Sequence, residues 1–88
     1  MIVIVEFVGG LRILANTDKR TIALEEPATI STLMSRLRSE LCSNGDELVE
    51  GSNLLIMKNE KEISALRGSQ TELDSNDVIT LIPVSHGG

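Results

Sequence analysis

The sequence is poor in aromatic residues, because Phe7 is the only one and tryptophan and tyrosine are absent. Proteins that bind single-stranded nucleic acid commonly stack its bases on aromatic side chains, and this chain offers no such platform. Basic residues are also in the minority: eight lysines and arginines face thirteen acidic residues, which gives a formal net charge of −5. A negative surface repels a phosphate backbone. We therefore expect no direct binding to nucleic acid, and a protein partner with a basic docking surface instead.

Cys42 is the only cysteine of the chain. A single thiol forms no internal disulfide and cannot supply the four ligands of an iron–sulfur cluster, which excludes a ferredoxin-like electron carrier. Cys42 is expected to be a small, partly buried hydrophobic residue. No apolar run approaches the roughly 20 residues of a membrane span, and Glu6 interrupts the apolar segment 1–5, so no signal-peptide pattern is seen. These absences predict a cytoplasmic protein without membrane contact.

The segment 2–8 predicts the first strand, and the 88 residues leave room for one domain only. Nearly every position in this segment is apolar and β-branched, which is typical of a strand inside a sheet. Glu6 prefers water, so the alternation of a strand places it on the outer face. The buried face then carries Val3, Val5 and Phe7, and the outer face carries Ile2, Ile4, Glu6 and Val8.

Further strands are predicted at 19–24, at 53–58, briefly at 63–66, and at 78–82. Residues 11–18 are expected to form a loop, and Pro83 is expected to end the last strand. One helix is predicted, because Thr29 is a good N-cap and apolar residues follow at helical spacing. These residues are Ile30, Leu33, Met34, Leu37 and Leu41.

The order strand, strand, helix, strand, short element, strand predicts an α+β roll of the β-grasp, or ubiquitin-like, type. In this fold a mixed sheet of four to five strands carries one main helix on one face, with the first and last strands side by side in its centre. The predicted domain spans residues 1–83, and residues 84–88 form a flexible C-terminal tail that ends in two glycines.

Three segments of the chain are distinctive together: Val5–Leu11, Leu73–Ile79 and Ser85–Gly88. They resemble, in turn, the first strand and turn, the acidic turn into the last strand, and the His-Gly-Gly ending of ubiquitin-related modifiers that double as sulfur carriers. This family includes small archaeal modifiers. Because the predicted helix fits in between, the resemblance spans essentially the whole chain. Residues 59–70 depart from it, since they lack the Asp-Trp-Glu-like segment of eukaryotic members.

The resemblance implies that the working group is the C-terminal carboxyl of Gly88 and that the chain is not itself an enzyme. A ubiquitin-activating-type enzyme would use ATP to adenylate Gly88, and a rhodanese or another persulfide protein would help to convert it to a thiocarboxylate. The sulfur would pass to a tRNA-thiolating enzyme, or the activated carboxyl would be joined to lysines of target proteins. No permanently bound cofactor and no metal site are expected.

The remaining candidate residues serve recognition. Glycines lack Cβ and can pass through a narrow channel, and a histidine in a mobile tail has no rigid partner to orient it as a base. We therefore expect Gly87 and His86 to be recognised as part of the tail. Ile4, Val8 and Ile82 fall on the outer sheet face, together with Val78 and Thr80, and predict a docking patch for the activating enzyme.

Three alternatives stay open at this point. The small sulfur-bearing subunit of molybdopterin synthase shares the fold and the diglycine ending, as does the sulfur carrier of the thiamine pathway. Copurification with a larger catalytic partner would identify the former. From a different class, the chain would be a β-grasp interaction module with an inert tail, in which case deletion of Gly87 and Gly88 leaves its binding intact.

Overall fold

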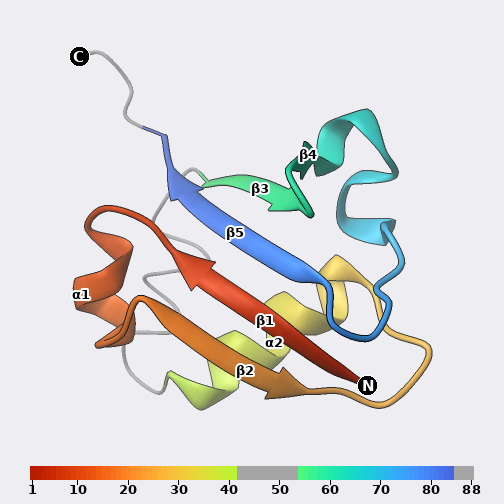
Figure 1. The fold of residues 1–88 in the computed structure, drawn as a ribbon, viewed down its shortest axis with the longest axis horizontal. Helices are drawn as coiled ribbons and strands as arrows, with labels where there is room; N and C mark the ends of the chain where they lie inside the picture. The colour runs from red at the N-terminus through yellow and green to blue at the C-terminus, as the bar shows by residue number, and fades with distance from the viewer. Residues whose placement is uncertain (42–53, 85–88) are drawn as a thin grey trace.

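The computed structural model describes residues 1–41 and 54–84, which form one mixed five-stranded sheet with a helix behind it (Figure 1). The strands are β1 (Ile2–Phe7), β2 (Lys19–Ala23), β3 (Leu54–Lys58), β4 (Lys61–Glu62) and β5 (Val78–Pro83), in the order β2-β1-β5-β3-β4. The helices are α1 (Leu11–Ala15) and α2 (Ile30–Glu40), and two 3₁₀ turns, η1 (Ile63–Ala65) and η2 (Gly68–Gln70), follow β4.

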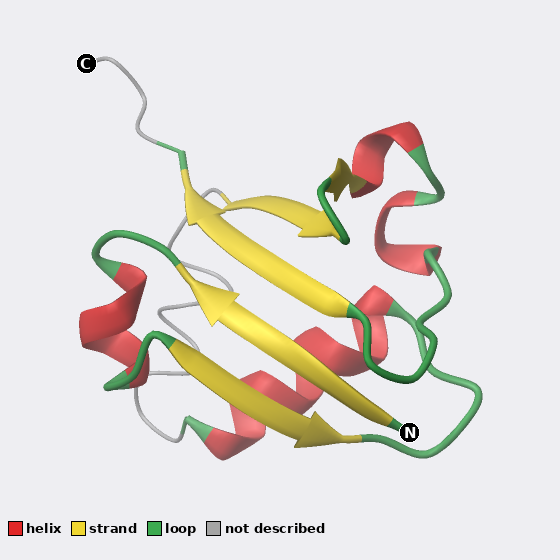
Figure 2. Ribbon diagram, viewed as in Figure 1, coloured by secondary structure: helices red, strands yellow, loops and turns green. Residues whose placement is uncertain are grey.

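β1 and β5 lie side by side and run parallel, whereas β1–β2, β3–β5 and β3–β4 are antiparallel. The first and last strands are therefore neighbours inside the sheet, as the sequence predicts. Figure 2 shows α2 covering one face of this sheet, and no helix within residues 1–41 and 54–84 covers the other face. We call this second face the open face. The arrangement confirms the predicted β-grasp roll.

The core lies between the sheet and α2 and is built mainly from aliphatic side chains. Every second residue of β1 points into it, and Val3, Val5 and Phe7 are buried as predicted. From α2, Leu33 and Leu37 are completely buried, as are Ile79 and Leu81 from β5. The apolar residues of α2 all lie on the one side that faces the sheet. The helix is therefore stabilised mainly by packing of this side against the sheet.

The predicted N-cap of α2 is confirmed, and it is reciprocal. Thr29 Oγ1 accepts a hydrogen bond from the Thr32 amide at 3.3 Å, and the Thr32 hydroxyl accepts one from the Thr29 amide at 3.2 Å. These bonds satisfy two amides that a helix start leaves unpaired. Ile30, Leu33, Leu37 and Leu41 of the predicted stripe are buried, and Met34 packs against the core from its edge.

The prediction of a loop over residues 11–18 is wrong, because Leu11–Ala15 form the short helix α1. Leu11 and Ala15 lie one turn apart and both are buried, so a single helical turn places two apolar side chains on the core. Asn16 ends this helix in the left-handed conformation, with φ of 59°, which asparagine tolerates better than most residues. The sequence shows no side-chain cap at Gly10, and the helix is too short for a clear periodic pattern.

Two smaller predictions also need correction. Residues 63–65 form a 3₁₀ turn rather than a strand, and the strand is instead the two-residue β4 before it. The tight turn at Asn59 and Glu60, both with positive φ, returns the chain directly onto β3. Pro83 does not follow the last strand but is its final residue, paired with Leu54. It is tolerated there because β1 pairs with β5 only as far as Leu81, so no β1 partner needs the missing amide.

Candidate functional site

The C-terminal tail leaves the sheet at a firmly held point. Ile79 and Leu81 anchor β5 in the core, and the strand runs straight to Pro83. Gly9, in the turn after β1, approaches this end closely, because a Cβ built on Gly9 would lie 3.3 Å from Cγ of Pro83. Gly9 also has φ of +61°, which favours glycine. The next residue, Val84, is 46% exposed, so the chain emerges into solvent directly after the clamped strand end.

The tail residues themselves, His86, Gly87 and Gly88, lie outside the described residues, as does Cys42. The predicted domain boundary after Pro83 stays a prediction for the same reason. It coincides with the last residue of β5. What the structure does describe is the surface around the root of the tail.

The predicted docking patch is divided in two. Ile4 is paired with Val78, and Glu6 is paired with Thr80, one step closer to the tail. Val8 follows β1, and its amide donates to the Leu81 carbonyl at 3.1 Å, which continues the ladder and places Val8 beside Ile82. The structure thus brings Val8 and Ile82 together at the root of the tail, and it separates both from Ile4 by the Glu6–Thr80 row.

The open face contains two further apolar residues that sequence reasoning did not identify. Leu55 is paired with Ile82, and Met57 is paired with Thr80, and both are partly exposed. Paired residues share a sheet face, so Leu55 completes a cluster with Val8 and Ile82. We call these three residues the tail-side patch. Alternation marks Leu55 and Met57 as sharing one face of β3, but only the register of β3 on β5 shows which face that is.

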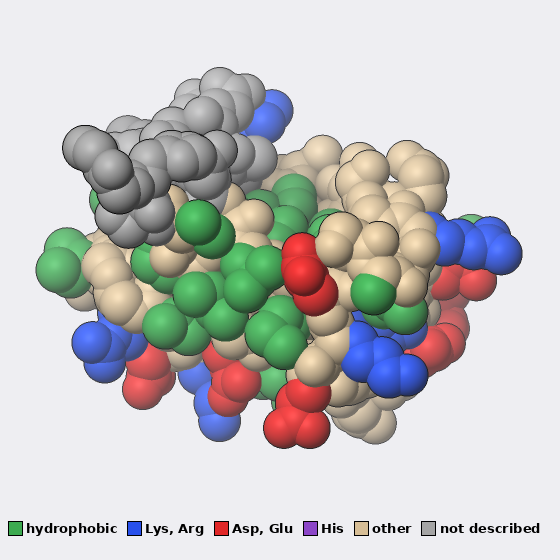
Figure 3. All heavy atoms as spheres, turned by 90° about the horizontal axis from the view of Figure 1, so that it is seen from above, with side chains coloured by type: hydrophobic (Ala, Val, Ile, Leu, Met, Phe, Trp, Pro, Cys, Tyr) green, Lys and Arg blue, Asp and Glu red, His purple; other side chains and the backbone are tan. Residues whose placement is uncertain are grey.

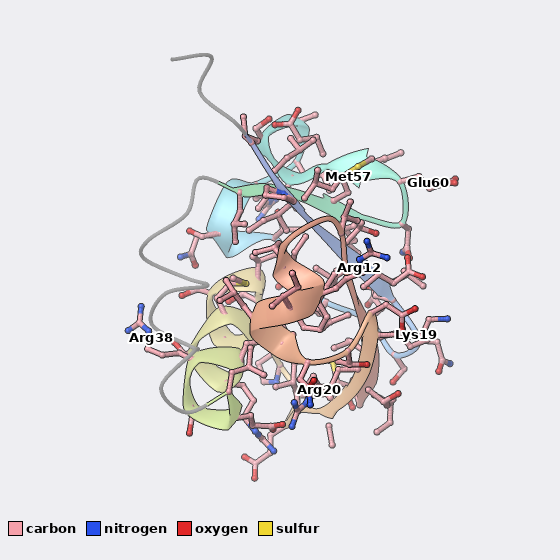
Figure 4. The ribbon with its side chains drawn as sticks, turned by 90° about the vertical axis from the view of Figure 1, so that its left-hand side faces the viewer. Arg12, Lys19, Arg20, Arg38, Met57 and Glu60 are labelled. Atoms are coloured by element: carbon pink, nitrogen blue, oxygen red, sulfur yellow. The ribbon has the colours of Figure 1, made fainter. Side chains whose placement is uncertain are left out.

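Figure 3 views the molecule from above, edge-on to the sheet, and hydrophobic side chains gather in the middle of that view. Figure 4 shows Met57 and Lys19 on the same side of the molecule, whereas Arg38 of α2 lies on the opposite side. Val8 is 39% exposed, which leaves its methyl groups available for contact with a partner.

Polar groups border the tail-side patch. The Glu6 carboxylate lies 3.9 Å from the Lys19 ammonium and 3.5 Å from the Thr80 hydroxyl. Both distances are long, and Lys19 is mostly exposed, so the pair contributes little stability. The row leaves a half-exposed carboxylate next to the apolar patch. A partner that covers this surface would therefore need to supply a polar or basic group opposite Glu6.

A buried polar network fixes where β5 begins. Asp77 is only 6% exposed, and its carboxylate accepts hydrogen bonds from the Asn59 side chain and from the Asp74 amide, each at 2.8 Å. The Lys58 ammonium lies 3.4 Å from the same carboxylate. Burial raises the pKa of Asp77, but these hydrogen bonds and the charge of Lys58 outweigh it and leave the pKa below its ordinary value. Asp77 is therefore ionised at neutral pH, and its contacts help to fix the position of β5.

Residues 1–41 and 54–84 bring no three histidine, cysteine, aspartate or glutamate side chains together in a way that would hold a metal ion. Within the same ranges, each helix is too short or too polar to cross a lipid bilayer.

The fold is shared by solved structures that the chain matches over its full length. SAMP1 from Haloferax volcanii has a TM-score of 0.78 at 11% identity, with 100% of both chains covered. Urm1 from Trypanosoma brucei has a TM-score of 0.73 at 21% identity, with 99% of this chain and 95% of that chain covered. A chain of the complex between subunits 1 and 2 of the molybdopterin-converting factor from Helicobacter pylori is matched at 24% identity with a TM-score of 0.67 and 100% of both chains covered.

These likenesses confirm the fold, and the family follows from the sequence itself. No curated protein sequence matches the chain. Residues 2–88 do match the family described as Urm1 (Ubiquitin related modifier), which covers every element of the fold and the diglycine ending. The chain therefore belongs to the family of ubiquitin related modifiers, and it is a ubiquitin-like sulfur carrier and modifier rather than an enzyme.

Proposed function

We propose that the Gly88 carboxyl is the group that is activated and delivered, while residues 1–83 serve as the handle by which enzymes hold it. An α-carboxylate has a pKa of about 3.3–3.7 and is ionised at neutral pH, which makes it a poor acyl donor. Its oxygen attacks the α-phosphorus of ATP in the activating enzyme, and pyrophosphate leaves. The resulting acyl-adenylate is a good acyl donor.

Sulfur enters at the adenylate. A persulfide sulfur of the donor protein attacks the carbonyl carbon of Gly88, the C–S bond forms, and AMP leaves with its electron pair. A second thiol then cleaves the S–S bond of the acyl persulfide, is itself oxidised to a disulfide, and releases the thiocarboxylate. The thiocarboxylate donates its sulfur to a tRNA-thiolating enzyme in the cytoplasm. Alternatively, a lysine amine attacks the activated carbonyl and is joined to Gly88 through an isopeptide bond.

The observation that supports this proposal is that β5 is held in the core while Val84, the residue directly after it, is exposed. β5 is anchored by Ile79 and Leu81, and the diglycine ends five residues after Pro83, the last residue of this strand. A fixed root defines where the tail starts, and two glycines without Cβ suit passage into a narrow active-site channel. The tail-side patch lies at the same root, so an enzyme that contacts Val8, Leu55 and Ile82 has the reacting carboxyl within its reach.

Mass spectrometry of the intact protein tests the proposal. The full chain is incubated with an activating enzyme of the ubiquitin-activating type, ATP and a persulfide donor protein. The expected product carries one sulfur atom in place of one oxygen atom at Gly88, and samples without ATP remain unchanged. A protein that keeps its original mass, while the same enzymes convert a known diglycine carrier, would contradict the proposal.

A second destination for the sulfur is molybdopterin synthesis, and the full-length match to a molybdopterin-converting factor subunit favours testing it. Affinity purification of the chain from its native cells decides between the destinations. Recovery of a larger synthase subunit indicates molybdopterin synthesis, whereas loss of thiolated tRNA in cells that lack the chain indicates tRNA thiolation. An inert interaction module would keep its binding and its phenotype when Gly87 and Gly88 are deleted.

A further inference from the structure

Four primary amines occur in the chain: the N-terminal amine of Met1 and the side chains of Lys19, Lys58 and Lys61. All four lie in described parts of the structure. A modifier that forms isopeptide bonds presents these amines to other activated copies of itself, so their availability decides whether and where it modifies itself. Availability is the property in which they differ most.

Two of the amines are held by the fold. The Met1 amine is partly buried and donates a hydrogen bond to the Leu24 carbonyl at 2.8 Å. The Lys58 ammonium donates to the Glu72 carbonyl at 2.7 Å and lies 3.4 Å from both Asp74 and Asp77, and its side chain is 17% exposed. To act as a nucleophile, Lys58 would have to leave the network that positions β5.

Lys19 is accessible, since its side chain is 61% exposed, but it lies on the open face opposite Glu6. This face also carries the tail-side patch. A second copy attached to Lys19 would therefore stand over the surface proposed for docking. Attachment there would block any further activation of the modified copy.

Lys61 differs from the other three amines. It lies on the exposed strand β4, directly after the tight turn at Asn59 and Glu60. Within residues 1–41 and 54–84 its ammonium forms no ion pair or hydrogen bond. Figure 4 shows Glu60, its neighbour, pointing away from the body of the molecule. In Figure 1, β4 lies beside the end of β3 that is away from the point where the tail leaves β5.

We infer that Nζ of Lys61 is the acceptor through which one copy of this chain is joined to the Gly88 carboxyl of a second copy. The inference rests on the proposed activation of Gly88. The neutral amine attacks the carbonyl carbon of the Gly88 adenylate, the C–N bond forms, and the C–O bond to AMP breaks. AMP leaves with the electron pair, and the extra proton on nitrogen passes to water. No oxidant or reductant is needed.

The position of Lys61 has a consequence for the product. Because alternation along β3 places Lys58, and with it the paired Lys61, on the sheet face opposite to the tail-side patch, a copy modified at Lys61 keeps the patch and the root of the tail free. The modified copy remains a substrate for the activating enzyme, and its own Gly88 can be joined to a third copy. Attachment at Lys61 therefore gives linear chains, whereas attachment at Lys19 would stop at a pair.

The experiment uses the full chain with an activating enzyme and ATP, without a sulfur donor, and analyses products by intact mass and tryptic peptides. Arg67 is the last tryptic site, so a linkage at Lys61 joins segment 68–88 to the peptide that contains Lys61. Pairs and longer chains are expected for the wild type and for the double variant Lys19→Arg, Lys58→Arg. Lys61→Arg should lose most of the linked product.

A parallel sample with a persulfide donor measures thiocarboxylate formation in the same variants. If Lys61→Arg forms thiocarboxylate normally and still forms linked chains, or if the linkage maps to another amine, the inference is overturned and the proposed function stands. A monomer that has lost one water, which means a ring closed within one copy, overturns it as well. Absence of both thiocarboxylate and linked product in the wild type overturns the proposed function and this inference together.

Discussion

The side-chain amide of Asn59 donates a hydrogen bond to Asp77 at 2.8 Å and so joins the turn after β3 to the start of β5. Asn59 also forms two hydrogen bonds with Val78. Its backbone amide donates to the Val78 carbonyl, and its side-chain oxygen accepts from the Val78 backbone amide, each at 2.8 Å. Lys58 adds a positive charge beside the same carboxylate. The register of the strand that leads to the tail is therefore set by a polar network at its far end.

The first prediction concerns pH. The pKa of Asp77 lies below its ordinary value of 3.8 in the folded chain. Its contribution to the free energy of unfolding is complete above the ordinary pKa and is lost as the pH falls through the lower folded pKa. Asp77→Asn should lower stability at pH 7 by about 1–3 kcal/mol, because a charged acceptor of two hydrogen bonds is lost. This difference from the wild type should shrink below about pH 4.

Urea unfolding at a series of pH values measures this effect. Asp74→Asn is the matched control, because Asp74 lies at the same 3.4 Å distance from Lys58 but its side chain is 82% exposed. Its effect at neutral pH should be small. If the free energy of unfolding falls in parallel for Asp77→Asn and the wild type as the pH is lowered, protonation of Asp77 does not cause the loss of stability in acid.

The second prediction concerns the turn that holds the end of β5. Gly9→Ala places a Cβ 3.3 Å from Pro83 at a φ of +61°, and it should lower the free energy of unfolding by about 1–2 kcal/mol. Gly10→Ala is the control at the adjacent position, because Gly10 has φ of −63° and an added Cβ meets nothing within 4 Å. Urea or thermal unfolding compares the two. Equal stability of both variants would mean that Gly9 does not clamp Pro83.

The parts of the fold that the sequence predicts are those in which periodicity and burial coincide. β1 and α2 are long enough to show alternation and the helical stripe, and their buried residues follow directly. The sequence does not predict helix α1, because this helix has only five residues, buries only two side chains and leaves Ile13 almost fully exposed. The 3₁₀ turns after β4 are shorter still, with three residues each, and their residues are mostly exposed.

The docking surface is predicted only in part, for a different reason. Val8 and Ile82 are found by alternation along two strands whose adjacency the fold class implies. Leu55 joins them through the register of β3 on β5, and Ile4 is separated from them by the Glu6–Thr80 row. The register of two strands depends on turns and on contacts between distant segments, such as the Asn59–Asp77 network. The periodicity of either strand alone does not determine it.

The third prediction concerns the terminal residue. Gly88→Ala should lower the rate of adenylation by roughly 100-fold, because a methyl group next to the carboxyl displaces the reacting oxygen in a narrow channel. An additional residue after Gly88 should abolish sulfur transfer altogether. Exchange of labelled pyrophosphate into ATP measures the first effect, and intact mass measures the second. Normal sulfur transfer by the extended chain would show that Gly88 is not the carrier.

The fourth prediction separates the two halves of the open face. Ile82 lies in the tail-side patch beside Val8 and Leu55, whereas Ile4 lies beyond the Glu6–Thr80 row, and both side chains are half-buried. If an activating enzyme docks on the tail-side patch, Ile82→Asp removes a central apolar contact. Such a loss is worth about 2 kcal/mol, or a roughly 30-fold weaker affinity.

Ile4→Asp should weaken binding much less, and Ile13→Asp on α1 should leave it unchanged, because Ile13 is 82% exposed and lies outside the patch. Binding to the activating enzyme is measured by titration calorimetry, after circular dichroism has shown that each variant is folded. The comparison of Ile82→Asp with Ile4→Asp is the decisive one, since the two substitutions put the same charge on the same sheet face at similar burial. An equal loss for both would indicate one continuous docking surface across the Glu6–Thr80 row. If neither substitution weakens binding, the activating enzyme docks elsewhere on the molecule. The tail-side patch would then have no part in activation, although it lies at the root of the tail.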